Sequence, residues 1–425
     1  LLIKGYSLSD IVSTIRLFGS KISIGRSCHE LYNIVNQHKM GNVPSDSDIR
    51  NIVGGKIDPD KVKLVFTTEY QRVSGQFSRK PDKVFLIVDE ASKSPYYRAF
   101  ISMADDIVRH KDYPAALVAL GDPEQAISVP EAFRIKKVQL LMEKVRDIVK
   151  KHGLRNRYVM LNVTYRLPSP SEEPISYGFY KGNLRAFENA ESRLRELSEL
   201  FEDVRGKAER LLRSIPGISF NSKTTQTVFN AVYEAVTSQS PIVMIDTDTF
   251  KPEKAMSTFD SSRVHLGLLA SLVLEAFVTE AKRTGSYYMP SIMVTAPYSD
   301  MILNASFSYV QKAKSIIGEQ PKFATIQSVI GGEADFVVTM LGKEYSGRSQ
   351  DIWGDDAYLT IYYNEPQVLN VQLSRHAKLL VVIGNIDELA TRRYINKKVK
   401  ETAETLKYLA SQDQKKAIYV DMRNK

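Results

Sequence analysis

The stretch VFLIVDE, residues Val84 to Glu90, decides the fold class of this chain. An unbroken apolar run that ends in two carboxylates, Asp89 and Glu90, is typical of a central parallel strand buried by helices on both faces. Open α/β sheets bind their ligands at the carboxyl ends of such strands. Two acids are costly to bury without partners, so we expect them to face a metal ion, water or a ligand crevice. A strand that runs into a solvated acidic turn is the alternative.

Two further apolar segments repeat this arrangement. Residues 62–66 (VKLVF) precede Thr67, and residues 115–120 (AALVAL) precede the cluster Gly121 to Gln125. Helical stretches lie between the segments, and this alternation indicates a doubly wound α/β sheet. A further strand of the first series is expected at residues 157–163. A second series begins near Ile242, with strands expected at residues 242–246, 292–295, 323–327, 334–340 and, as the last clear strand, 379–383. The sequence therefore predicts two α/β domains.

Composition narrows the class of protein. A chain of 425 residues with 43% hydrophobic and 25% charged residues suits two or three soluble globular domains. Its net charge of +9 fits a polyanionic partner without proving one. The single cysteine, Cys28, excludes an internal disulfide and is consistent with a reducing intracellular compartment, cytoplasmic or nuclear. The sequence contains no run of 18 apolar residues, so we expect no membrane span.

Two charged stretches leave their role open. Residues 188–214 form an amphipathic helical pattern with a narrow apolar seam, which suits either an arm that binds a partner or nucleic acid or, as we favour, a helix packed on its own domain. The tail from Asp387 is helical and basic, and it fits either nucleic-acid contact or a solvated helix face. The chain begins LLIKGYSLSD, without Met and in mid-pattern, and we expect it to be part of a longer one.

Six clusters, in this order, resemble the motor core of superfamily 1 helicases, in the branch of the nonsense-mediated-decay RNA helicase and the replication helicase-nuclease. The clusters are DEAS at 89–92, GDPEQ at 121–125, YRLP at 165–168 with FYKGNL at 179–184, TAPY at 295–298, GGEAD at 331–335, and NVQLSR at 370–375 with VVIGN at 381–385. Each cluster alone is weakly specific. Their shared order over residues 20–386 makes the resemblance specific.

This resemblance implies two RecA-like doubly wound parallel-sheet domains, residues 1–163 and 164–425. A helical insertion at about 185–240 would lie in the second domain and could bind protein partners. The implied activity is ATP-dependent helicase movement along single-stranded DNA or RNA, with 5′→3′ polarity and with ATP and Mg²⁺ bound. Closing and opening of the cleft between the domains would produce the movement.

The resemblance also implies catalytic roles. Asp89 would hold Mg²⁺, Glu90 would act as general base on the attacking water, and Gln125 would sense the γ-phosphate or that water. Arg166 and Arg375 would stabilise transition-state charge as arginine fingers. A surface ion pair is the alternative for either arginine.

Binding roles follow in the same way. Tyr165 would stack on the adenine, and Glu333 would contact the ribose. Hydroxyl groups and backbone N–H groups suit sequence-independent contact with phosphates, and an aromatic ring can stack on a base. The candidates for nucleic-acid contact are Ser27, His29, Thr67, Pro297, Tyr298, Thr325 and Ser328.

Three departures from the family pattern matter. The Walker A sequence is absent, and we expect it upstream of Leu1. Ile330 replaces the usual Gln of the fifth motif, and His376 stands where a small residue is usual. Val368 and Leu369 occupy the stretch where an arginine often precedes the last motif. A nucleic-acid-binding scaffold with a decayed motor is therefore the main alternative, and a P-loop ATPase unrelated to nucleic acid is a third.

Overall fold

The computed structural model describes residues 84–92, 115–125, 139–154, 157–247, 263–286, 289–318, 321–342, 360–392 and 395–422. The chain forms two compact units. The first consists of Leu1–Gly121 and Val138–Ile148, and the second of Asp122–Lys137 and Val149–Lys425. The predicted domain boundary after Val163 stays a prediction.

In the first unit, two of the predicted strands pair in parallel. β1 (Val84–Val88) and β2 (Ala115–Ala119) run in register from Val84 opposite Ala115 to Val88 opposite Ala119. Because the strands are parallel, the residues that follow both of them lie at one edge of this pair. The start of α5 (Leu141–Lys151) packs its buried apolar residues against Ala91, which follows β1.

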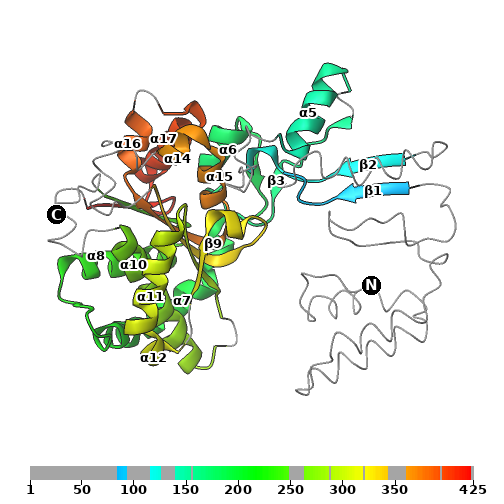
Figure 1. The fold of residues 1–425 in the computed structure, drawn as a ribbon. Helices are drawn as coiled ribbons and strands as arrows, with labels where there is room; N and C mark the ends of the chain where they lie inside the picture. Colours follow the sequence, from blue (N-terminus) through cyan, green and yellow to red (C-terminus); the bar gives the residue numbers. More distant parts are fainter. Residues whose placement is uncertain are drawn as a thin grey trace, which may run out of the picture. The chain divides into compact units, whose positions relative to one another are not determined.

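The second unit contains a six-stranded parallel sheet (Figure 1) with the strand order β10-β5-β9-β8-β6-β7. The strands are β5 (Ile242–Asp246), β6 (Ile292–Ala296), β7 (Lys322–Thr325), β8 (Ala334–Met340), β9 (His376–Gly384) and β10 (Ile418–Asp421). A small parallel pair, β3 (Val163–Thr164) and β4 (Arg185–Ala186), stands apart from this sheet. The α/β fold class is confirmed, and the sheet is that of a RecA-like domain.

Alternate residues along each central strand enter two different cores. On β5, Val243 and Ile245 belong to one core, whereas Ile242 and Met244 belong to the other. This period of two is what a strand buried on both faces requires. Figure 1 shows α7, α8, α10, α11 and α12 on one side of the sheet and α6, α14, α15, α16 and α17 on the other.

The helices of this unit connect the parallel strands and cover both faces of the sheet. They are α6 (Glu173–Tyr180), α7 (Ala190–Arg213), α8 (Lys223–Thr237), α10 (Arg263–Arg283), α11 (Ser299–Lys312), α12 (Lys314–Ile317), α14 (Thr360–Asn364), α15 (Gln367–Leu373), α16 (Ile386–Thr391) and α17 (Lys397–Gln412). Two short 3₁₀ turns are η2 (Pro123–Gln125) and η5 (Ile326–Val329).

The long amphipathic helix predicted at residues 188–214 is α7, and it packs on its own domain. The Asn189 side chain caps it by accepting a hydrogen bond from the backbone N–H of Ser192 at 2.8 Å. Its apolar seam is buried in the same core as α8 and α10, where Phe201 stacks on Phe277 with ring centroids 4.3 Å apart. Aromatic pairs of this kind contribute about 0.5–1.5 kcal/mol beyond burial.

The helix α10 is long and apolar enough to cross a membrane by length and composition alone. Its side chains are nevertheless almost all buried between the sheet and the helices α7, α8 and α11. A core helix of a large domain has the same composition, because it is covered all round.

Two predictions about strands are wrong. Residues 158–162 are not a strand, and only Val163 and Thr164 pair, with Arg185 and Ala186. An apolar run makes a strand only where another strand offers its backbone. The Asn162 carbonyl accepts from the Arg185 N–H at 2.9 Å, but within the described stretches residues 158–161 belong to no sheet. Residues 379–383 lie in β9 but are not in the last strand, because β10 follows α17 and pairs with β5.

Candidate nucleotide and nucleic-acid site

The two carboxylates predicted to hold Mg²⁺ and activate water follow β1 directly. Asp89 and Glu90 are both exposed, and the Asp89 carboxylate accepts a hydrogen bond from the Glu90 backbone N–H at 2.9 Å. Glu90 has a φ of 50°, a left-handed conformation that is costly for a residue with a side chain. The next residue, Ala91, donates its N–H to Leu120 at 2.8 Å, so the turn is fastened to the end of β2.

One exposed carboxylate is a sufficient protein ligand for Mg²⁺, which keeps several waters and takes one or two carboxylates. Within the described stretches, no three His, Cys, Asp or Glu side chains come together in a metal-binding group. Asp89 therefore fits the Mg²⁺ expected from the sequence better than it would fit a metal that needs a protein cage.

The GDPEQ cluster continues into the second unit, where it is held by a half-buried polar network. Asp122 accepts hydrogen bonds from the Glu124 backbone N–H at 2.9 Å and from the Tyr180 hydroxyl. Burial raises the pKa of Asp122, and these two hydrogen bonds oppose the increase. Asn370 donates to the Tyr180 oxygen at 2.8 Å and to the Glu124 carbonyl at 2.9 Å. Residues from η2, α6 and α15 thus fix the turn that carries Gln125.

The Glu124 side chain also connects this turn to α17. Its carboxylate forms an ion pair with Lys398, whose side chain is also within 5.7 Å of the Phe179 ring centroid. Three other basic residues of the tail pair with acids four positions away, Arg392 with Glu388, Lys397 with Glu401 and Lys400 with Glu404, and Lys407 pairs with Asp387. These pairs favour the solvated-face interpretation of the basic tail.

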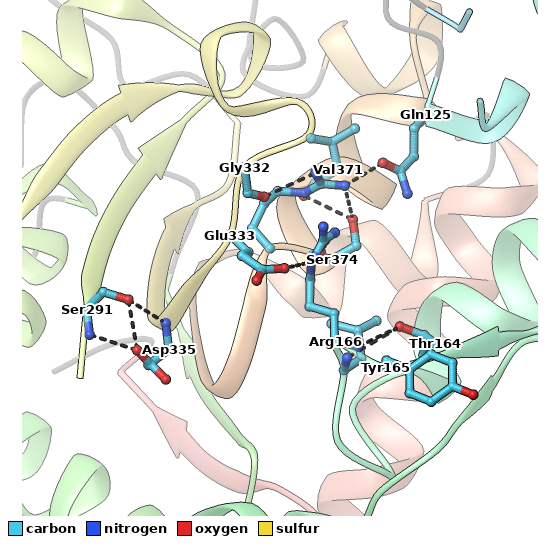
Figure 2. Close-up of polar contacts among 12 residues, drawn as sticks. Gln125, Thr164, Tyr165, Arg166, Ser291, Gly332, Glu333, Asp335, Val371 and Ser374 are labelled. Carbon is cyan, nitrogen blue, oxygen red and sulfur yellow. Dashed lines mark hydrogen bonds and ion pairs between the residues drawn. The ribbon is translucent and has the colours of Figure 1, made fainter. Parts of the chain in front are cut away.

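Arg375 is fully buried, so the surface-ion-pair alternative is wrong for this residue. Its guanidinium donates to the carbonyls of Val371 and Gly332, each at 3.3 Å, to the Ser374 hydroxyl at 2.9 Å and to the side-chain oxygen of Gln125. Figure 2 shows Gln125, Gly332, Val371 and Ser374 gathered in one place. A planar guanidinium that is held on several sides has a fixed direction, which an arginine finger needs.

Arg166 also contacts Ser374, although it comes from the loop that follows β3. Its Nη1 donates to the Ser374 carbonyl at 3.2 Å, and its Nε pairs with the Glu333 carboxylate at 2.7 Å (Figure 2). The Arg166 and Glu333 side chains are 28% and 60% exposed. An ion pair between such accessible groups contributes about 0–1 kcal/mol, so an anionic ligand can compete for Arg166.

A pocket of about 480 Å³ opens beside this ion pair. Its lining combines the predicted adenine, ribose and phosphate contacts with residues outside the motifs: Val163, Thr164, Tyr165, Arg166, Arg193, Glu333 and Ala377. This size lies in the range of small-molecule sites. Tyr165 is 67% exposed, so its ring is accessible for stacking.

Glu333 and Arg375 lie at the amino ends of β8 and β9, because Ala334 pairs with His376 at the start of both strands. These two residues therefore precede their strands, as α15 ends at Leu373 and β9 begins at His376.

The predicted nucleic-acid contacts of the second unit do gather at the carboxyl edge of the sheet. Ala296 and Thr325 pair as the last residues of β6 and β7, so Pro297 and Tyr298 lie beside the turn that contains Ser328. Pro297 is buried, Tyr298 is half-buried at the N-cap of α11, and Ser328 is exposed. The Ser328 hydroxyl donates to the Thr325 carbonyl at 2.8 Å, and the Thr325 hydroxyl donates to Ser328 at 3.3 Å.

Comparison with known families decides the membership of the chain. A family model described as AAA domain matches residues 140–387, more than half of the sequence. The chain belongs to this AAA domain family. The family is the helicase C-terminal domain of superfamily 1 helicases, and its members are P-loop helicase-like ATPases. No curated protein matches the chain.

The AAA domain match covers Tyr165, Arg166, Glu333 and Arg375, whereas α17 and β10 follow it in the chain. The predicted contacts Ser27, His29 and Thr67 lie outside the described residues, so their roles stay predictions.

Sequence reasoning missed several residues of this AAA domain site. Asp122, Tyr180 and Asn370 lie inside the matched motifs, but nothing in their spacing shows that they bond to one another. Phe187 and Arg193 belong to no quoted motif. The only available signal was their position within 30 residues of Tyr165 along the chain.

His376, a departure from the family pattern, is fully buried. Its Nε2 lies 2.7 Å from the Ser171 hydroxyl, which itself donates to the Pro168 carbonyl at 2.6 Å. Burial, reinforced by the charges of Arg166 and Arg375, lowers the pKa of His376 to about 3. The imidazole is therefore neutral near pH 7 and joins the start of β9 to the segment that carries Arg166. Ile330, another departure, packs against the core on the α6 and α17 side.

Proposed function

We propose that the protein is an ATP-dependent helicase or translocase that hydrolyses ATP to move along single-stranded DNA or RNA. The observation that carries this proposal is the placement of Arg166 and Arg375, which come from distant parts of the chain and both hydrogen-bond to Ser374. Two cations held together next to a nucleotide-sized pocket suit the stabilisation of charge on a transferring phosphoryl group.

Each residue has a role in the proposed reaction. Glu90 orients and deprotonates the attacking water, and Asp89 would hold Mg²⁺, which supplies charge neutralisation when bound. Gln125 senses the phosphoryl group through its bond to Arg375. In the pocket, Tyr165 stacks on the base and Glu333 accepts hydrogen bonds from the ribose hydroxyls.

The single-stranded nucleic acid would lie over the carboxyl edge of β6 and β7. Tyr298 would stack on a base, while Pro297 shapes the turn next to it. Thr325 and Ser328 would contact phosphates after their hydroxyls rotate away from their local acceptors. The net charge of +9 favours such a polyanion. We propose 5′→3′ movement and an intracellular location, cytoplasmic or nuclear, on the basis of the branch resemblance and the single cysteine.

The test measures ATP hydrolysis by the full-length protein with and without single-stranded DNA or RNA, beside Glu90→Gln. Strong stimulation by a polymer, abolished in Glu90→Gln and kept in the exposed control Glu199→Gln, would support the proposal. Salt-sensitive binding to single strands without ATP hydrolysis would overturn it in favour of a scaffold with a decayed motor.

The proposed contacts with single-stranded nucleic acid need a separate binding measurement. Tyr298→Ala should weaken single-strand binding by about 5- to 150-fold, the effect of losing one stacked base, whereas Tyr298→Phe keeps the ring. Tyr408→Ala is the control, because Tyr408 is an exposed aromatic residue on α17. Equal binding by Tyr298→Ala and Tyr408→Ala would remove Tyr298 from the strand path.

A further inference from the structure

The Tyr165 loop rests on a segment that no helicase motif contains, residues 185–193. β3 and β4 pair Val163 with Arg185 and Thr164 with Ala186. Backbone hydrogen bonds extend this pairing on both sides of Tyr165, from Phe187 N–H to the Thr164 carbonyl at 2.9 Å and from Ser169 N–H to the Glu188 carbonyl at 2.8 Å. The loop that carries Tyr165 and Arg166 therefore has its position set by this segment.

Phe187 supports the Tyr165 ring directly. The two ring centroids are 4.7 Å apart with the planes tilted by 35°. Phe187 is 61% exposed and does not line the pocket, whereas Tyr165 does. Burial does not hold an exposed Phe187 in place. Its described aromatic contact is with the Tyr165 ring, which we expect to stack on the base.

Arg193 holds the backbone of the same residue. Its Nη2 donates to the Tyr165 carbonyl at 2.6 Å, and its Nε pairs with the Glu188 carboxylate. The Arg193 carbonyl in turn accepts from Lys378 on β9 at 3.0 Å. Arg193 lines the pocket, and its side chain is only 22% exposed. One guanidinium thus joins α7 to the Tyr165 loop with two differently directed hydrogen bonds, a geometry that a lysine cannot reproduce.

We propose that Phe187 and Arg193 are positioning residues for the base of a purine nucleoside triphosphate, acting by fixing the Tyr165 ring at the pocket. This inference rests on the proposed function and adds to it the two residues that set base affinity. A purine offers a larger face to a fixed ring than a pyrimidine, so the loss of either residue costs purine nucleotides more. Phe187 does not hold Arg166 or Arg375, so the phosphate contacts of these two residues should not depend on Phe187.

The experiment compares Phe187→Ala, Arg193→Ala and Arg193→Lys in the full-length protein, with Arg195→Ala as control. Arg195 is on the same helix, but it is 64% exposed and pairs with Glu191. Phe187→Ala should raise KM for ATP by about 2- to 12-fold, the range that corresponds to one aromatic pair, with kcat changed less than about twofold. Arg193→Lys should behave like Arg193→Ala, because the hydrogen-bond geometry and not the charge is required.

Inhibition by inorganic tripolyphosphate, which has no base, separates positioning from general damage. Its inhibition constant should stay the same in Phe187→Ala, and KM for CTP should rise less than KM for ATP. Equal changes for ATP, CTP and tripolyphosphate, or no change in any of them, would overturn the inference while ATP hydrolysis by the unsubstituted protein still supports the proposed function. If calorimetry detects no nucleotide binding by the unsubstituted protein, both this inference and the proposed function are wrong.

Discussion

The buried Arg375 guanidinium donates a hydrogen bond to the side-chain oxygen of Gln125, 250 residues away in sequence. Gln125 follows the β2 strand end, whereas Arg375 precedes β9. This bond couples the residue expected to sense the phosphoryl group to the residue expected to stabilise its charge. The pair should therefore behave as one catalytic unit.

Arg375→Lys should lower kcat for ATP by about 10³-fold or more, as for the loss of an arginine finger. Gln125→Ala should cost on the order of 10²-fold. Because residues that act as a unit are not additive, the double variant should be no slower than Arg375→Lys alone. Steady-state kinetics test this, with Arg392→Lys as control and thermal unfolding to confirm that each variant folds. Multiplicative losses in the double variant would show independent roles.

The Tyr180 hydroxyl should matter for stability far more than its neighbour on α6. Tyr180→Phe removes the donor to Asp122 and the acceptor of Asn370, which should cost about 1–3 kcal/mol. Tyr177→Phe, at a residue 57% exposed on the same helix, should change stability by less than about 0.5 kcal/mol. Urea unfolding measures both. Equal effects would contradict the network.

The stability lost in Tyr180→Phe should also depend on pH. Burial raises the pKa of Asp122 and the Tyr180 bond lowers it, so without the bond the pKa rises further. A carboxyl that becomes protonated in the folded state no longer carries the cost of a buried charge. The destabilisation by Tyr180→Phe should therefore shrink as pH falls, and a constant difference between pH 7 and pH 4 would argue against this cause.

Gly178 and Gly206 should respond oppositely to alanine. A Cβ on Gly178 would lie 2.0 Å from Thr402 Oγ1 and 2.6 Å from the Lys398 carbonyl oxygen, so α6 and α17 would have to separate. Overpacking of this kind costs about 1–3 kcal/mol. On Gly206 in α7 the nearest atom would be Arg210 Nη1 at 3.8 Å, so alanine should stabilise by about 0.5–1 kcal/mol. Denaturant midpoints for the two variants provide the test.

His376 should make folding sensitive to mild acid. Its pKa is lowered to about 3 in the folded protein and stays near its ordinary 6.5 in the unfolded chain. The unfolded state therefore binds more protons between these values, so stability is complete above pH 6.5 and falls below it by up to about 1.4 kcal/mol per pH unit. His376→Ala should flatten this part of the profile, whereas His152→Gln, at an exposed residue, should not. Parallel profiles for all three proteins would remove His376 as the cause.

The central strands β1, β2, β5, β6 and β8 could be predicted because central parallel strands are continuous apolar runs. Arg166, Glu333 and Arg375 could be predicted as a group because their motifs are short and keep a fixed order. The bonds from Tyr180 to Asp122 and from Arg193 to Tyr165 could not, because sequence spacing carries no information on which side chains meet after folding. β10 was missed because its four residues, Ile418–Asp421, are a strand only through pairing with β5.

The position of α17 and β10 beyond residue 387 has a practical consequence for anyone who shortens this protein. A fragment cut at the family boundary would lose α17 with its buried Leu406 and Leu409, would uncover the apolar core on which they pack, and would leave β5 with an open hydrogen-bonding edge. Uncapped edges recruit strands from other molecules. Expression of the isolated family region should therefore yield aggregates, and the autonomous folding unit should extend through Asp421.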